Sequence, residues 1–136
     1  MPADPDRIWT AALVVIGDEI LSGRTQDKNI GQVASWLDVH DIRLREVRVV
    51  PDVEGGIVEA VNVLRARNDY LFTTGGIGPT HDDITVDAVA RALGVGVVIH
   101  PAARAMLARY YATRGGLNHG RLRMAGGPVR AELVAN

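Results

Sequence analysis

The residues with the clearest chemical potential lie in one glycine-rich stretch, Thr73–Thr85. It carries glycines at positions 75, 76 and 78, followed by the adjacent carboxylates Asp82 and Asp83. Glycines let a backbone approach a ligand closely, and the free N–H groups at the start of a helix favour an anion. Carboxylates beside a bound phosphate repel it unless a divalent cation lies between them. The stretch therefore suggests metal-bridged recognition of a phosphorylated small molecule.

An ordinary turn between a strand and a helix is the alternative interpretation of the same residues. Glycines are frequent in such turns, and an Asp at a helix start commonly caps the helix and complements its dipole. No Gly-Lys-Ser/Thr follows the glycines, so the stretch is not a P-loop, and it lacks the Gly-x-Gly-x-x-Gly spacing of dinucleotide-binding loops. By spacing alone, both interpretations stay open.

A second acidic stretch with glycines comes earlier in the chain. Gly17–Gly23 contains Asp18, Glu19 and Ser22, and it directly follows the apolar run Thr10–Ile16. Ser22 could hydrogen-bond a ligand or stabilise the turn. This loop and the later glycine-rich stretch thus both place glycines and carboxylates directly after an apolar run.

Apolar patterns predict the elements that position these loops. The nearly continuous run at 10–16 is typical of a buried parallel strand, and residues 69–72 form a second buried run. Alternation over 42–50 predicts a strand near a sheet edge with solvated arginines, rather than a phosphate patch, and it ends at Pro51-Asp52. Helical spacing of apolar residues starts near positions 30, 53, 84 and 101. An N-cap role for the second of these helices would explain Asp52, and Gly94 supplies a helix stop.

The last third of the chain gives weaker patterns. A short strand is expected within Val95–Ile99, and Pro101 suits the first position of a helix whose core-facing side holds Ala103, Met106, Leu107 and Tyr110. Arg114–Arg123 is either a solvated loop or a basic arm that reaches a phosphate. We expect a turn at Gly126–Pro128 and a last strand at Ala131–Ala135.

The alternation of strands and helices predicts a three-layer α/β fold with a mainly parallel sheet. Ligands of such folds bind beyond the carboxyl ends of the strands, at the point where the strand order reverses. If the first and third strands are neighbours across that point, the two acidic glycine loops converge. Their convergence would favour a functional role for both.

Composition sets the broad class of the protein. A chain of 136 residues, 47% hydrophobic and 23% charged, fits one domain, for which we expect the bounds 10–136 after a tail at 1–9. The net charge of −1 gives no reason to expect nucleic acid or a membrane surface as partner. The absence of cysteine excludes disulfides and thiolate metal sites and fits a reducing compartment. No segment resembles a signal peptide or a membrane span, so a cytoplasmic protein is expected.

The whole string Thr-Gly-Gly-x-Gly-Pro-Thr-x-Asp-Asp at 74–83 resembles the signature of the molybdopterin-binding domain family (the MoaB/Mog-like fold), in its CinA-like branch. The resemblance extends over most of the chain. Gly17–Gly23 is similar to the first motif of the family, and Asp27-Lys28-Asn29 matches the Asp-x-Asn that follows it. Val50-Pro51-Asp52 resembles the segment that contributes a functional aspartate, and Thr85 completes the ending of the second motif.

This resemblance implies a site for a phosphorylated pterin or nucleotide with a divalent metal, magnesium being the expected ion. Family members transfer adenylyl groups to molybdopterin, and CinA-like relatives are linked to pyrophosphate cleavage of ADP-ribose. By this resemblance Asp82 and Asp83 would bind the metal or position water, and Asp52 would act at the rim. Ligand contacts would come from two groups of residues: Gly17, Asp18, Glu19 and Ser22, and Gly75, Gly76, Gly78, Thr80 and Thr85.

Three further expectations follow from the resemblance. Homo-oligomers are usual in the family, so a non-catalytic oligomeric binding or scaffold module is an alternative function. A generic nucleotide binder without a pterin link is a weaker one, because both common nucleotide fingerprints are absent. Relatives continue past a strand like Ala131–Ala135 into a Pro-Gly loop and a final helix, which we expect this domain to lack together with the amidase domain of longer CinA proteins.

Overall fold

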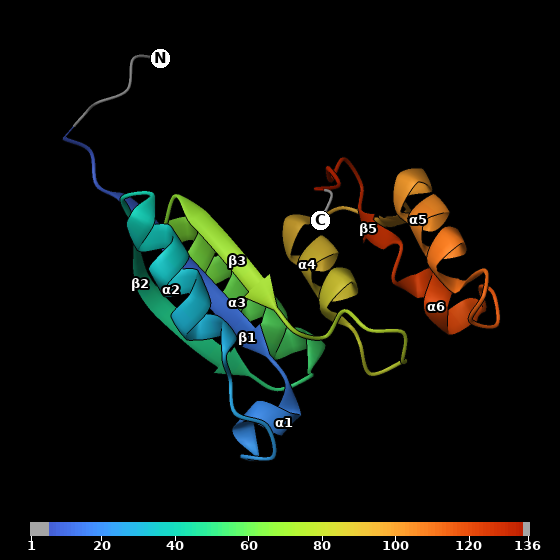
Figure 1. Cartoon of the computed structure of the whole chain (residues 1–136). Coiled ribbons are helices and arrows are strands. Elements are labelled where there is room, and N and C mark those ends of the chain that lie inside the picture. The colour runs from blue at the N-terminus through green and yellow to red at the C-terminus, as the bar shows by residue number, and fades with distance from the viewer. Residues whose placement is uncertain (1–5, 135–136) are drawn as a thin grey trace.

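The computed structural model describes residues 6–134 and has a parallel sheet covered by helices on both faces (Figure 1). The sheet contains β1 (Trp9–Ile16), β2 (Ile42–Val50) and β3 (Tyr70–Thr74), in the order β2-β1-β3. The helix α2 (Asn29–Val39) lies on one face and α3 (Glu54–Arg67) on the other. The predicted α/β class is confirmed, and β2 occupies an edge of this sheet, as its alternating pattern predicted.

The core lies on both sides of β1, the central strand. Residues 11–16 are all buried, which explains why this run is apolar without interruption. One set of β1 side chains packs against α3, where Ile57 and Leu64 are fully buried. On the opposite side, Leu37 of α2 is also fully buried. The carboxyl end of β1 is therefore fixed in a well-packed core, and the loop that follows it starts from a rigid position.

A second unit follows the parallel sheet. It begins with α4 (Thr85–Leu93), which packs against α3 and places Ala88 and Ala92 in the core. After it come β4 (Val97–Ile99), α5 (Pro101–Tyr111), α6 (His119–Arg123) and β5 (Gly126–Pro128), and β4 and β5 pair in antiparallel fashion. The predicted ends of α4 and α5 are confirmed, because Gly94 caps α4 with a left-handed φ of +69° and Pro101 opens α5.

Several expectations for this second unit are wrong. Gly126–Pro128 is a strand and not a turn, and residues 131–134 form no strand, while Ala135 lies outside the described residues. No residue of α5 is buried, and Met106 and Tyr110 are exposed, because α5 lies on the outer side of this unit (Figure 1). The apolar spacing correctly predicted a helix at α5, but the prediction that one side of this helix is buried in the core is wrong.

The first strand begins one residue before the expected position. Residues 1–5 of the expected tail lie outside the described residues, and β1 begins at Trp9. The loop expected after β1 contains one short helix, α1 (Asp18–Leu21). None of the helices within residues 6–134 combines the length and the hydrophobicity of a membrane-spanning segment.

Candidate functional site at the carboxyl ends of the strands

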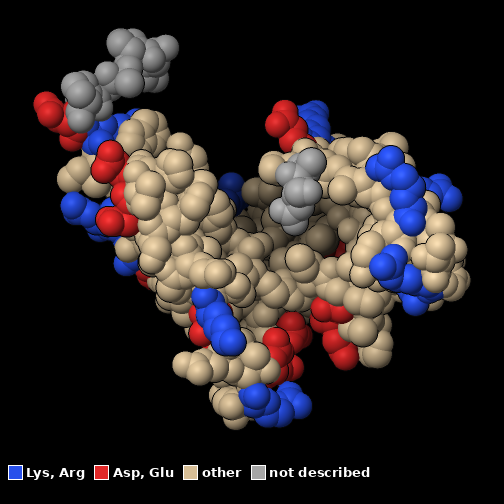
Figure 2. Space-filling view, viewed as in Figure 1, with Lys and Arg blue, Asp and Glu red and all other residues tan. Residues whose placement is uncertain are grey.

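The loops that follow β1, β2 and β3 meet at one cavity of about 360 Å³. This acidic cavity lies at the carboxyl ends of the parallel strands, where the chain order reverses between β1 and β3. Figure 2 shows acidic side chains gathered along the lower edge of the molecule, where Figure 1 places α1 and the loop before α4. The two acidic glycine loops converge as the fold rules predicted. The walls of the acidic cavity are formed by Ile16, Asp18, Glu19, Arg24, Asp52, Gly76, Asp82 and Asp83.

Asp18 and Asp52 join the first two loops by a reciprocal pair of hydrogen bonds. The Asp18 N–H donates to Asp52 Oδ2 at 3.1 Å, and the Asp52 N–H donates to Asp18 Oδ1 at 3.1 Å. Asp52 does not cap α3, whose N-cap is Val53 without a side-chain bond, so the capping explanation of Asp52 is wrong. Each carboxylate satisfies the backbone of the other loop and also lines the cavity.

Around α1, Ser22 is engaged within its own turn. Its hydroxyl donates to the Glu19 carbonyl at 3.3 Å and accepts from Arg24 Nε at 3.0 Å. Of the two roles considered for Ser22, these bonds favour turn stabilisation. Arg24 lines the acidic cavity although the sequence analysis did not single it out. In the sequence, only the position of Arg24 directly after Gly23 pointed to a place at this cavity.

The glycine loop needs glycine at positions 75 and 76. Both have left-handed φ angles, +89° and +66°. A Cβ on Gly75 would lie 2.0 Å from the carbonyl oxygen of Ile16, and one on Gly76 would lie 2.2 Å from the hydroxyl of Thr85. The loop therefore lies directly against the end of β1 on one side and the start of α4 on the other.

Thr85 supports this loop from within the protein. Only 2% of Thr85 is exposed, and its hydroxyl donates to the Gly75 carbonyl at 2.8 Å. Its backbone N–H donates to the Gly76 carbonyl at 3.1 Å. The structure thus places Thr85 beneath the glycines, where it fixes their backbone, and not among the residues that line the cavity.

Asp83 is held in the turn that follows the glycines. The backbone N–H and the hydroxyl of Thr80 both donate to Asp83 Oδ2, at 2.9 and 2.8 Å. Burial raises the pKa of Asp83, but hydrogen bonds from Thr80 and from the Gly78 backbone, together with the positive charge of Arg123, outweigh it and lower the pKa below its ordinary value. Asp83 is therefore a fixed, negatively charged group at neutral pH.

Asp82 differs from its neighbour because its side chain is 79% exposed. Asp82 Oδ1 lies 3.4 Å from His81 Nε2. Within residues 6–134, no three His, Asp or Glu side chains gather closely enough to hold a metal ion by themselves. The acidic cavity consequently offers separate carboxylate oxygens on several walls and not a closed metal cage.

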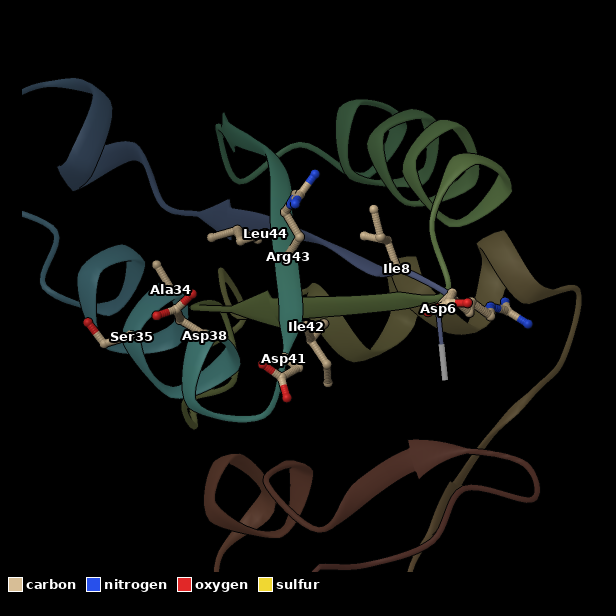
Figure 3. Close-up of a pocket in the computed structure, with 10 residues that line it drawn as sticks. Asp6, Ile8, Ala34, Ser35, Asp38, Asp41, Ile42, Arg43 and Leu44 are labelled. Atoms are coloured by element: carbon tan, nitrogen blue, oxygen red, sulfur yellow. The ribbon is translucent and has the colours of Figure 1, made fainter. Parts of the chain in front are cut away.

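A larger cavity of about 640 Å³ lies at the opposite end of the sheet. Figure 3 shows its lining side chains, which come from the end of α2, the start of β2 and the segment before β1. None of the site residues expected from the sequence lines it. Since open parallel sheets bind ligands at the carboxyl ends of their strands, the smaller acidic cavity is the candidate site.

Similarity to known proteins shows the family to which the fold belongs. Residues 12–133 match the family described as "Probable molybdopterin binding domain". A protein of Aeropyrum pernix is 40% identical over 131 residues, which are 96% of this chain and 48% of that protein. A CinA-like protein of Geobacter metallireducens is 37% identical over 92% of this chain and 30% of its own length.

Among solved structures, CinA from Thermoplasma acidophilum is similar in fold, with a TM-score of 0.82 and 34% sequence identity. The match covers 88% of this chain and 70% of that one. The chain spans about half the length of the first curated relatives it matches. The similarity therefore concerns the domain that carries the acidic cavity.

Proposed function

The chain belongs to the molybdopterin-binding domain family, in its CinA-like branch, and we propose that its acidic cavity binds a phosphorylated pterin or nucleotide together with a divalent cation. The observation that carries this proposal is the meeting of Gly76 and Asp83 with Asp18 and Asp52 at one cavity. The backbone of the glycine loop at Gly76 and carboxylates for a cation thus border the same space.

The glycine loop is the part suited to the phosphate. Gly75 and Gly76 let the loop lie close against Ile16 and Thr85, and the backbone of Gly76 borders the acidic cavity. The loop ends at the first turn of α4, where the dipole of the helix favours negative charge. Thr80 adds a hydroxyl beside the loop, already oriented by its bond to Asp83.

The carboxylates suit a divalent cation such as magnesium, which is commonly bound by one or two carboxylates plus phosphate oxygens of the ligand. Asp82 and Asp83 would hold the ion, with Asp18 and Glu19 on the opposite wall of the cavity. The absence of a three-residue cluster in the described part fits an ion that arrives with its ligand. Such an ion would neutralise charge on the phosphate oxygens.

Chemistry at phosphorus depends more on positioning and on charge neutralisation than on a protein nucleophile. Asp83 is ionised and held by Thr80, so it can orient a water or a ligand hydroxyl. Asp52 lines the cavity and keeps the first loop in place through its hydrogen bonds with Asp18. These residues support metal-dependent nucleotidyl transfer or pyrophosphate hydrolysis.

A non-catalytic, oligomeric binding module is the second candidate. Asp18 and Asp52 each accept a hydrogen bond from the backbone N–H of the other, so both have a structural role even when no ligand is bound. This observation favours the second candidate. In that case the cavity binds a ligand without turning it over, and the assembly state does not depend on the ligand.

Incubation with ADP-ribose and a panel of divalent metals, with AMP release as the readout, tests the proposal. Asp83→Asn is expected to lose metal-dependent release by about a hundredfold or more, as positioned charged groups do when removed. Asp38→Asn is the matched control, because Asp38 lies in α2 beside the larger cavity at the opposite end of the sheet.

Binding of ADP-ribose with Mg²⁺, measured by calorimetry, separates the outcomes. Binding without AMP release supports the non-catalytic candidate. If wild type binds neither ADP-ribose nor molybdopterin with any metal, the proposed ligand class is wrong. Release that is equal in wild type and Asp83→Asn refutes the assignment of the acidic cavity.

A further inference from the structure

Arg123 connects the second unit to the turn that carries Asp83. Its Nη1 donates to the Thr80 carbonyl at 3.0 Å, and its Nη2 donates to the Asp83 carbonyl at 3.1 Å. These two carbonyls bracket the turn 80–83, and Arg123 is about forty residues away along the sequence. The Arg123 guanidinium therefore holds both ends of the turn 80–83, and the hydrogen bonds from Thr80 to the Asp83 carboxylate hold the same turn from within.

Hydrogen bonds within α6 and the loop before it fix the position of this arginine. The Asn118 side chain accepts from the Arg121 N–H at 2.8 Å and caps the helix. Arg121 Nη1 donates to the Arg114 and Gly116 carbonyls, at 2.7 and 2.8 Å, so it organises its own loop. Residues 114–118 of this basic stretch are thus a loop, as one interpretation of the sequence predicted, whereas residues 119–123 form the helix α6.

Close backbone contact reinforces the connection. A Cβ on Gly120 would lie only 2.7 Å from the carbonyl oxygen of Pro79, so α6 rests directly on the turn. Arg123 also lies 3.9 Å from Asp87, but that pair is solvent-exposed and contributes little by itself. Charge-assisted bonds to two main-chain carbonyls are the stronger interaction.

We propose that Arg123 is a positioning residue for the acidic cavity, which fixes the turn 79–83 so that the Asp83 carboxylate keeps its place on the cavity wall. The inference rests on the proposed function of that cavity. It assigns a role to α6 and predicts that the second unit tunes ligand affinity although Arg123 does not line the acidic cavity.

Three variants test the inference: Arg123→Gln, Arg123→Lys and, as control, Arg109→Gln at an exposed position of α5. Hydrogen–deuterium exchange of residues 77–84 measures the order of the turn. Calorimetry with ADP-ribose and Mg²⁺ measures affinity, and thermal unfolding reports global stability. For Arg123→Gln we expect exchange of the turn to rise and affinity to fall, each by about tenfold, as for the loss of hydrogen bonds to a charged group.

Arg123→Lys should recover part of the affinity, because an ammonium keeps the charge but not the two-carbonyl geometry. Arg109→Gln should leave both readouts at the wild-type level. The positioning role is overturned if Arg123→Gln leaves the exchange of residues 77–84 unchanged. It is also overturned if exchange becomes faster in this variant while its affinity for the ligand is unchanged. Loss of affinity without faster exchange also overturns it. If wild type binds neither ADP-ribose nor molybdopterin with any metal, the proposed function fails, and that outcome is distinct because it appears before any variant is compared.

Discussion

Replacing Gly75 by alanine offers a direct test of how the glycine loop is built. Gly75 has a φ of +89°, and a Cβ there would lie 2.0 Å from the carbonyl oxygen of Ile16. Gly94, at the end of α4, has a φ of +69° with no atom within 4 Å of an added Cβ. Gly94→Ala therefore carries backbone strain without a collision, and the difference between the two variants isolates the collision.

The expected magnitudes follow from this geometry. A left-handed alanine costs about 1–2 kcal/mol at either position. An ordinary carbon–oxygen contact is about 3.3 Å, so at position 75 the chain must shift by about 1.3 Å. Ile16 is 1% exposed and ends the central strand, so the shift disturbs packed core and adds about 1–3 kcal/mol. We expect a loss of about 2–5 kcal/mol for Gly75→Ala and about 1–2 kcal/mol for Gly94→Ala.

Urea and thermal unfolding of the two variants and wild type provide the measurement. At about 4 °C per kcal/mol for a domain of this size, Gly75→Ala should lower Tm by about 8–20 °C and Gly94→Ala by about 4–8 °C. Equal losses in both variants would refute the reasoning, because they would show that Ile16 accommodates the extra carbon freely.

Two other outcomes are expected. Thr85→Val removes the hydroxyl that donates to the Gly75 carbonyl in a site that is 2% exposed, so the free energy of unfolding should fall by about 1–3 kcal/mol; an unchanged urea midpoint would argue against this support of the loop. Because the pKa of Asp83 is lowered from 3.8 in the folded state, its charge stabilises the fold above pH 3.8, and this contribution is lost as pH falls through the folded-state pKa. The stability difference between wild type and Asp83→Asn should therefore be constant above about pH 5 and shrink below about pH 4 in acid unfolding experiments; a difference independent of pH would contradict the lowered pKa.

The parallel sheet could be predicted because its signals are local and strong. The uninterrupted run that became β1 could only be buried on both faces, and the alternating run that became β2 fitted an edge. The position of the acidic cavity followed from a general rule on strand ends, so two distant loops could be placed together without any contact being known.

The connections between loops could not be predicted from the sequence. The bonds between Asp18 and Asp52 join residues 34 apart in the chain, and no local pattern encodes such a pair. A cap and a cross-loop partner also look the same in sequence, which is why Asp52 was misinterpreted. Arg123 lay in a stretch that resembled a loop, because a helix of five residues is too short to show periodicity.

The placement of β1 between β2 and β3 has a consequence for how the protein folds. Both strand pairs are parallel, so each requires a crossover, and closing such long-range pairs is slow compared with forming local structure. The acidic cavity takes its walls from the segments after all three strands, so it cannot exist until the last of them has joined. During synthesis the carboxylates thus stay apart until the chain has passed Asp83, and they come together only as the sheet closes.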